Sequence, residues 1–349
     1  MRLLAPLGAL FGGAAALKAG LYRRGYLSQR RLAGPVISVG NLSVGGSGKT
    51  PVVSCVAEML RNEGMRVAIL SRGYGGAFRG EALVVSDGRS VLADVSLAGD
   101  EPVMLARSLE GVIVAVGPRR DVVGQAVEAR FGRCVHVLDD GFQHLRLARD
   151  LDILCVDVRD LADRPLPAGR LREFPSALRR ADLVLLASGD AGASVRLPPV
   201  AHGIDADRVF GLSRRSEGFF SAAGEPRPAP RAAWLLHGIA RPERFQADVR
   251  ACAAVLGVSG FPDHHPFSLG ELRDVLERAR AAGADAVVTT AKDAVRLPSL
   301  DAEPPVLVFR VRAEITDLER FRARVLAAAA DARPGKPRGA ASEPTRQAG

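Results

Sequence analysis

Lys49 and Thr50 are the residues best suited to chemistry in this sequence, because they follow a glycine-rich turn at the end of an apolar run. Residues 35–51 read PVISVGNLSVGGSGKTP. Glycines let backbone N–H groups reach phosphate oxygens, and a helix that starts at Lys49 adds the positive end of its dipole. Lys49 can contact the β- and γ-phosphates, and the Thr50 hydroxyl suits Mg²⁺. The stretch predicts an ATP site formed by Ser43, Val44, Gly45, Gly46, Ser47, Gly48, Lys49 and Thr50.

The loop departs from the general phosphate-loop pattern G-x-x-x-x-G-K-[ST] at one position, where Ser43 replaces glycine. A chance GKT in a turn is the alternative, but an apolar run before the loop and a helical pattern after it are the context that the motif requires. Only four of the 48 Lys and Arg residues are lysine. Since arginine serves almost everywhere else, lysine at position 49 indicates a need for a compact ammonium group.

Acidic residues stand beside two other predicted elements. Asp139 and Asp140 come directly after the apolar run 135–138. A carboxylate at the end of a buried strand is what a Mg²⁺-nucleotide site requires, although Asp-Gly is also an ordinary turn pair. Asp100 stands in the sequence GDEP before the helical stretch 103–109, where a helix-capping role is the simpler alternative.

Short apolar runs predict the strands that must position these residues. Helical patterns separate the runs, and their hydrophobic residues are continuous rather than alternating, which indicates burial on both faces. The sequence therefore predicts an α/β fold with a doubly wound, mostly parallel sheet, as in P-loop NTPases. Ligands bind beyond the carboxyl ends of the strands in such sheets. The runs are 36–39, 67–70, 112–116, 135–138, 153–156 and 183–186.

The 349 residues are enough for two domains, and a smaller α/β unit is predicted from apolar runs at 233–236, 286–290 and 306–311. Prolines at 226, 228 and 230 indicate a stiff connection before this unit. The predicted parts are an N-terminal helix with a basic flank (1–31), a P-loop domain (32–190), a Pro/Gly-rich connection (191–231), a C-terminal α/β domain (232–330) and a disordered tail (331–349).

A net charge of +9 indicates an anionic partner, which could be nucleic acid, a membrane surface or a phosphorylated substrate. Aromatic residues make up only 5% of the sequence, which also lacks zinc-binding spacing and a basic helix with stacking residues. We therefore expect no nucleic-acid partner. Four separated cysteines in apolar segments are typical of reduced core thiols in a cytosolic protein. The sequence leaves the oligomeric state open.

The N-terminal run at residues 3–17 is apolar and uncharged, and Lys18, Arg23, Arg24, Arg30 and Arg31 follow it. A secretory signal would export the following domain away from ATP, and a membrane-spanning helix needs about 20 apolar residues. An interfacial helix whose basic flank contacts anionic headgroups fits the pattern better. The alternative is an amphipathic helix packed on the domain. We expect this segment to contact a membrane surface.

Eight motifs in order make the sequence resemble the tetraacyldisaccharide 4'-kinase family of lipid A biosynthesis over residues 35–325. The resemblance implies that the ATP γ-phosphate is transferred, with Mg²⁺, to the 4'-hydroxyl of an acylated glucosamine disaccharide 1-phosphate at the cytoplasmic face of a Gram-negative inner membrane. Ser43 is typical of this family, whereas Ala291 replaces its usual glutamate and residues 161–165 its usual glycine-rich loop. The motifs are VGNLSVGGSGKTP (39–51), SRGYGG (71–76), GDEP (99–102), DDGFQHLRLARDLDI (139–153), LPAGRLRE (166–173), HGIARPERF (237–245), DHH (263–265) and TTAKDAVRL (289–297).

The resemblance also implies roles for particular residues. Asp100 is expected to accept the proton of the 4'-hydroxyl with help from His264, and Asp139 or Asp140 is the alternative base. Closure of the second domain would bring His264 to the phosphate. The implied Mg²⁺ ligands are Thr50, Glu101, Asp139 and Gln143, and the implied contacts to the anionic glycolipid are Arg72, Tyr74, Arg119, Arg120, His144 and Arg172.

Two other functions use a similar loop. A membrane-associated P-loop ATPase switch also has a GGxGKT loop, but that class has a lysine directly before the two glycines, where this chain has Val44. A nucleotide-gated membrane adaptor without acceptor chemistry is the other alternative. The kinase is favoured, because the loop, the apolar N-terminus and the excess positive charge together suit an anionic lipid substrate.

Overall fold

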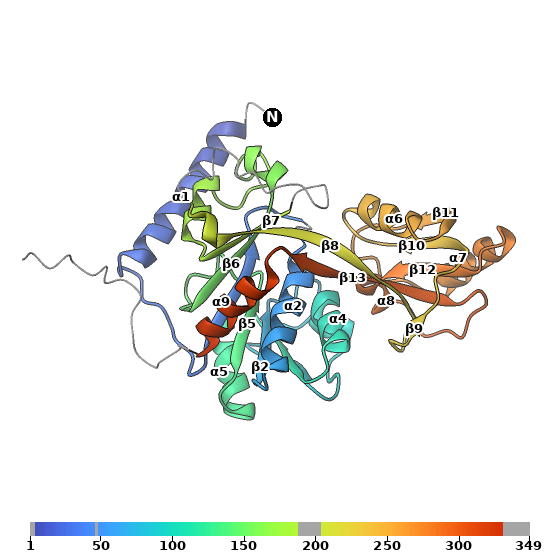
Figure 1. Cartoon of the computed structure of the whole chain (residues 1–349), viewed down its shortest axis with the longest axis horizontal. Coiled ribbons are helices and arrows are strands. Elements are labelled where there is room, and N and C mark those ends of the chain that lie inside the picture. The colour runs from blue at the N-terminus through green and yellow to red at the C-terminus, as the bar shows by residue number, and fades with distance from the viewer. Residues whose placement is uncertain (1–3, 46–47, 188–203, 331–349) are drawn as a thin grey trace, which may run out of the picture.

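The computed structural model describes residues 4–45, 48–187 and 204–330. Figure 1 shows two lobes side by side, with α1 on the side of the larger lobe that faces away from the smaller one. One mixed sheet of 13 strands runs through both lobes in the order β11-β10-β12-β13-β8-β7-β6-β1-β5-β2-β4-β3, and β9 pairs with β8. The predicted α/β class with a mostly parallel sheet is confirmed.

The larger lobe contains all six strands that the continuous apolar runs predict. Their side chains are buried on both faces of the sheet, as the absence of alternation indicated. The parallel strands are β1 (Val36–Asn41), β2 (Val67–Ser71), β4 (Val112–Val116), β5 (Val135–Asp139), β6 (Leu151–Asp157) and β7 (Leu183–Ala187), and the edge strand β3 (Leu83–Asp87) runs antiparallel to β4. The accompanying helices are α2 (Lys49–Asn62), α3 (Val95–Ala98), α4 (Asp100–Ser108), α5 (Arg120–Phe131), and the 3-10 helices η2 (Val158–Ala162) and η3 (Pro175–Arg180).

The smaller lobe is a parallel sheet with its own two apolar clusters. Its longest helix, α7, starts with a capping box in which Ser268 and Glu271 satisfy each other's backbone N–H groups. The elements are β10 (Ala232–His237), α6 (Pro242–Arg250), β11 (Ala254–Gly260), α7 (Leu269–Ala281), β12 (Ala286–Thr290) and α8 (Ala291–Ala294). The predicted strands at 233–236 and 286–290 are confirmed, and β11 was not predicted.

Two long antiparallel strands join the lobes. β8 (Val209–Phe220) pairs in parallel with β7 at its start and antiparallel with β13 (Val306–Ile315) along the rest of its length. Figure 1 shows both strands crossing from one lobe to the other. The predicted Pro/Gly-rich connection at 191–231 is therefore wrong in part, because it contains β8, with η5 (Ala206–Arg208) before it and β9 (Pro226–Arg227) after it. Residues 191–203 of that prediction, and the predicted tail at 331–349, lie outside the described residues.

The last helix, α9 (Leu318–Ala330), returns to the larger lobe. Phe321 and Val325 are fully buried in the main core of that lobe, and the Phe321 ring packs edge-on against Phe210, with 5.5 Å between centroids. The predicted C-terminal domain of residues 232–330 consequently ends too late, because α9 belongs to the other lobe. Of the cysteines, Cys134 and Cys155 are buried as expected, Cys55 is half-buried, and Cys252 is exposed.

The N-terminal helix α1 (Ala5–Arg23) packs through its smallest residues. Gly8 and Gly12 lie so close to Pro165, Ala168 and Phe174 that added Cβ atoms would collide with them. The bulky apolar residues of α1 point elsewhere, and Leu10 and Leu17 are 72% and 66% exposed. Across the described ranges, no helix is both long and apolar enough to cross a bilayer.

Candidate active site

The phosphate loop connects β1 to α2. β1 ends at Asn41, and α2 begins at Lys49 directly after Gly48, whose φ of +79° is a conformation that favours glycine. Lys49 Nζ donates a hydrogen bond to Asn41 Oδ1 at 3.0 Å and lies 3.3 Å from Asp140 Oδ1. These contacts hold the ammonium group at a helix start, where the helix dipole also favours an anion. Two other predicted nucleotide contacts, Gly46 and Ser47, lie outside the described residues.

The first residues of the loop are held by the segment that follows β6. Ser43 Oγ donates to Asp160 Oδ2 at 2.5 Å, and the Val44 N–H donates to the Arg170 carbonyl oxygen at 2.9 Å. A glycine at position 43 would lose the first of these bonds, which accounts for the serine. The predicted contact from the Val44 N–H to a phosphate would require the second bond to break. Gly45, with φ of +102°, is exposed.

Two adjacent carboxylates near the loop, those of Asp139 and Asp140, have different environments. Asp139, the last residue of β5, is buried and accepts a hydrogen bond from Ser71 Oγ at 3.1 Å. Burial raises the pKa of Asp139, although the Lys49 charge opposes this effect. Asp140 accepts hydrogen bonds from Arg172 at 2.7 and 2.8 Å. Burial opposes ionisation of Asp140 too, but the charges of Lys49 and Arg172 outweigh it and lower the pKa.

Glu101 lies near enough to Asp139 for the two charges to interact. Burial raises the pKa of Glu101 to about 7, and the Asp139 charge adds to this effect. Thr50 and Glu101 also line one cleft. Carboxylates that repel each other, together with a hydroxyl, form an oxygen donor set that suits Mg²⁺. Thr50, Glu101 and Asp139 therefore fit this ion chemically, although the described side chains contain no preformed cluster of three or more His, Cys, Asp or Glu for a metal.

The fourth predicted metal ligand, Gln143, is engaged in a different network. Its Nε2 donates to the Asn41 carbonyl oxygen at 3.0 Å and to Glu173 Oε1 at 3.2 Å, while its Oε1 lies 3.4 Å from Arg172 Nη1. Two members of this network, Asn41 and Glu173, were not among the predicted site residues, and Asn41 connects the network to Lys49. Asn41 lies in the motif at 39–51 and Glu173 in the motif at 166–173, so membership in these motifs was the signal that could have identified both residues.

Asp100 begins α4 and meets His264 from the smaller lobe. Gly99 precedes it with φ of +88°, and a Cβ at that position would collide with the Tyr74 carbonyl oxygen, so the turn that presents Asp100 requires glycine. Asp100 is only 3% exposed, and its Oδ2 lies 3.0 Å from His264 Nδ1. The structure therefore brings together the two residues that the motifs GDEP and DHH predicted as partners.

Lys292 and Arg296 of the smaller lobe also approach Asp100 Oδ2, at 3.8 and 3.6 Å. Lys292 Nζ lies 3.2 Å from His264 Nε2 and 3.1 Å from Asp263 Oδ1. Since an ammonium group can only donate, Nε2 is the acceptor of this bond, and a neutral His264 ring carries its proton on Nδ1. Nδ1 lies 3.0 Å from Asp100 Oδ2, but the pair does not have the geometry of a hydrogen bond. Asp263 Oδ2 favours the opposite tautomer, but its contact with Nε2 is longer, at 3.4 Å. Lys292 and Arg296 had no predicted role.

The predicted glycolipid contacts follow neighbouring parallel strands of the larger lobe. Arg72 Nη1 donates to the Tyr74 hydroxyl at 3.2 Å and lies over its ring, while Arg119 pairs with Asp121 at 3.1 Å. Arg120 is buried, and its Nε has no partner among the described atoms. Burial and the Arg120 charge lower the pKa of His144 to about 4, so this residue is neutral at pH 7. Together with Arg172, these residues form a basic surface beside the carboxylates.

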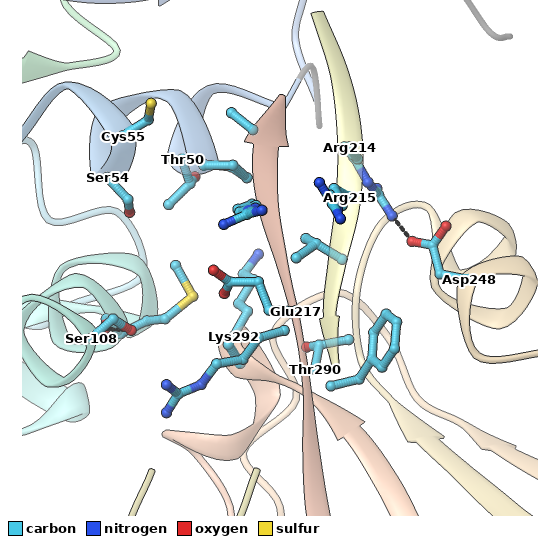
Figure 2. Close-up of a pocket in the computed structure, with 18 of the residues that line it drawn as sticks. Thr50, Ser54, Cys55, Ser108, Arg214, Arg215, Glu217, Asp248, Thr290 and Lys292 are labelled. Carbon is cyan, nitrogen blue, oxygen red and sulfur yellow. Dashed lines mark hydrogen bonds and ion pairs between the residues drawn. The ribbon is translucent and has the colours of Figure 1, made fainter. Parts of the chain in front are cut away.

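A cleft of about 860 Å³ runs from the loop toward the strands that join the lobes. In Figure 2, Thr50 and Ser54 on α2 line one side of the cleft, while Arg214 and Arg215 lie across it on β8. Lys292 lines the cleft as well, so the cleft reaches the Asp100 cluster. This space is large enough for a nucleotide whose phosphates lie at the loop.

A second ionic contact connects the lobes near the loop. Arg244 on α6 donates to Asp157 Oδ2 at 2.8 Å, and Asp157 also accepts from Arg159 at 2.7 Å. Arg241 approaches the loop itself, because a Cβ on Gly45 would lie 3.9 Å from its guanidinium. The motif HGIARPERF thus supplies both arginines at the boundary between the lobes.

Comparisons with known proteins agree with this geometry. The model of the family described as Tetraacyldisaccharide-1-P 4'-kinase matches residues 1–330. A Tetraacyldisaccharide 4'-kinase from Anaeromyxobacter dehalogenans (strain 2CP-C) is 45% identical over 89% of this chain and 88% of its own length. One from Geobacter sulfurreducens is 43% identical over 84% and 83%. The solved "apo" form of LpxK from Aquifex aeolicus in complex with ATP has a TM-score of 0.78 and 29% identity, and the match covers 94% of this chain and 99% of that one.

Proposed function

Because this chain belongs to the tetraacyldisaccharide-1-P 4'-kinase family, we propose that it transfers the γ-phosphate of ATP to the 4'-hydroxyl of an acylated glucosamine disaccharide 1-phosphate. The observation that carries this proposal is the 3.0 Å contact between Asp100 and His264, beside the loop that holds Lys49. A switch or an adaptor needs the loop but has no use for a buried carboxylate oriented by a histidine. The ATPase switch is therefore not favoured.

The site residues have two separate tasks in this reaction: some hold the phosphates, and others accept the proton of the hydroxyl. The 4'-oxygen forms a bond to the γ-phosphorus, the bond from that phosphorus to the β–γ bridging oxygen breaks, and ADP leaves. Asp100 accepts the hydroxyl proton, and His264 orients its carboxylate. Lys49 holds the β- and γ-phosphates throughout. Thr50, Glu101 and Asp139 would hold Mg²⁺, which supplies neutralisation of phosphate charge when bound.

The basic surface is the proposed site of the anionic glycolipid. Arg120 supports this, because a buried guanidinium with an unused Nε is costly unless an anion or a polar group reaches it. Arg72, Tyr74, Arg119, His144 and Arg172 follow strands β2, β4, β5 and β6, whose carboxyl ends lie on the same edge of the sheet as the phosphate loop. The acceptor sugar would then lie between this surface and Asp100.

The membrane contact proposed for this chain is through α1, at the cytoplasmic face of the inner membrane. Gly8 and Gly12 face the protein while Leu10 and Leu17 are exposed, so the bulky side of the helix is available to lipid. Removal of residues 1–30 should weaken binding to anionic liposomes, and the lost part should be salt-sensitive, at about 1 kcal/mol per basic residue near the surface. Unchanged binding by the truncated protein would place the anchor elsewhere.

The activity itself is tested with γ-labelled ATP, incubated with the protein and either water or the lipid disaccharide. If the protein is the proposed kinase, the label should appear in the lipid disaccharide. Label only in free phosphate would identify a switch, and no transfer to either acceptor would identify an adaptor. The Lys49→Ala protein, checked for folding by circular dichroism, is the control for contaminating kinases.

A further inference from the structure

A second cavity, of about 560 Å³, lies against the C-terminal half of α1 and the segments that follow β5 and β6. It shares no lining residue with the cleft of Figure 2. Its α1 side is formed by the small residues Ala16, Ala19 and Gly20, with Tyr22 and Arg23 at the end of the helix. None of its lining residues contacts Lys49 or Asp100 directly, and only Glu173 belongs to the network around Gln143.

The lining of this cavity carries excess positive charge. Its two carboxylates are already neutralised, since Asp152 accepts from Arg149 at 2.9 Å and Glu173 accepts from Arg180 at 2.5 and 3.0 Å. Two more arginines, Arg23 and Arg179, also line it. Both are exposed, and neither has an acidic partner among the described residues. The lining therefore has four arginines and two carboxylates, which leaves a net charge of two positive units around the cavity.

One arginine in the wall of the cavity, Arg180, is held in place. The Arg180 guanidinium lies over the Phe142 ring, 4.5 Å from its centroid, and its two terminal nitrogens are fixed by Glu173. Its Nε is buried and has no partner among the described atoms, so the wall contains an unused donor. Arg180 therefore loses little conformational freedom when an anion binds nearby, whereas Arg23 and Arg179, which are exposed, become ordered only on binding.

The surroundings indicate that the anion belongs to a lipid. Leu17 lies two residues before Ala19 on α1 and is 66% exposed, and Tyr26, just beyond the helix, is 75% exposed. Tyr22, which lines the cavity, has the apolar body and polar tip typical of residues at a membrane interface. A molecule that satisfies both the charge and the exposed apolar residues has a phosphate and acyl chains.

We propose that this cavity binds the headgroup of an anionic phospholipid of the bilayer, with its phosphate between Arg23 and Arg179. The bound lipid would fix the rotation of α1 at the membrane surface, in addition to the diffuse attraction of the basic flank. Its occupant is then a bilayer lipid rather than the phosphate acceptor, because none of the lining residues contacts Asp100, which the acceptor hydroxyl must reach.

Binding of short-chain lipids to the full chain in detergent tests this proposal. The probes are dihexanoyl phosphatidylglycerol, dihexanoyl phosphatidylcholine and inorganic phosphate, titrated by calorimetry into the wild type and Arg23→Gln/Arg179→Gln. The control is Arg89→Gln/Arg278→Gln, which removes the same charge from two exposed arginines that do not line the cavity. Circular dichroism checks that every variant is folded.

We expect one phosphatidylglycerol per chain for the wild type and the control, at least tenfold weaker binding for Arg23→Gln/Arg179→Gln, and no saturable binding of phosphatidylcholine. Equal binding by the cavity variant, or an equal loss in the control, would overturn the site. Phosphate binding as tight as that of phosphatidylglycerol would show a free-phosphate site instead. Displacement of the phospholipid by an equimolar amount of lipid disaccharide would show that the cavity belongs to the acceptor.

Discussion

Lys49 and Asp100 differ in which lobe supplies the side chains around them. Lys49 contacts Asn41 and Asp140, and all three residues belong to the larger lobe. Asp100 also belongs to that lobe, but the side chains that approach its Oδ2 come from the smaller lobe and are His264, Lys292 and Arg296. The described contacts of Lys49 therefore lie within one lobe, although both lobes line the cleft beside it, whereas the contacts of Asp100 Oδ2 form only where the lobes meet.

This difference suggests a division of labour during turnover. Lys49 can contact the phosphates of ATP from the larger lobe alone, while a competent base requires contact between the lobes. Transfer to water would then be suppressed until the lobes meet. β8 and β13 are the strands that such a movement would bend, since they carry the sheet between the lobes. Scattering with and without nucleotide and lipid would contradict the movement if the shape stayed the same.

The largest expected effect on activity comes from removing Lys49, which is expected to hold the phosphates of ATP. Lys49→Ala should lower kcat/KM on the order of 10³-fold or more, because Lys49 is the lysine that the phosphate loop places at the start of α2. The fold should survive, since Lys49 lies at a half-buried helix start rather than in the core. Transfer assays and circular dichroism measure the two outcomes. Turnover at the wild-type rate by a folded variant would remove Lys49 from the mechanism.

A smaller effect on kcat is expected from removing Lys292, which lies beside Asp100 and His264 where the lobes meet. Lys292→Ala should lower kcat about tenfold and leave ATP affinity nearly unchanged, because it removes the donor that keeps the His264 proton on Nδ1. Steady-state kinetics with a separate ATP-binding titration distinguish these quantities. The matched control is Arg278→Ala, which removes an exposed cation of the same lobe. A weaker ATP affinity with unchanged kcat would instead assign Lys292 to the nucleotide.

The smallest effect concerns stability in the larger lobe. The pKa of His144 is about 4 in the folded protein, below its ordinary value of 6.5, so the unfolded chain binds more protons between these pH values. The free energy of unfolding should therefore fall as pH drops from 6.5 to 4, and His144→Asn should reduce this slope. Denaturant unfolding at pH 7 and pH 4.5 measures it. Equal pH slopes for both proteins would show that His144 is not buried as a neutral group.

The sequence was sufficient for the six buried parallel strands of the larger lobe, and the family resemblance for the pairing of GDEP with DHH, but neither predicted β8 or the packing of α9. β8 was not predicted because its centre, from Ser213 to Glu217, is polar and charged, as expected for a strand exposed between two lobes. α9 was assigned to the wrong lobe because proximity in sequence does not show where a helix packs. Ser43 bonds to Asp160 across 117 positions, and no local pattern shows such a contact.

The central claim, that Asp100 and His264 act as one unit across the lobes, is tested most directly by a double-mutant cycle on kcat. Asp100→Asn and His264→Ala should each lower kcat by roughly 10²–10⁴-fold, the range of general base catalysis. The double variant should lose much less than the product of the two single losses, because residues that act together are not additive. Losses that multiply would separate the two roles, and a near-wild-type kcat for Asp100→Asn would return the base to Asp139 or Asp140.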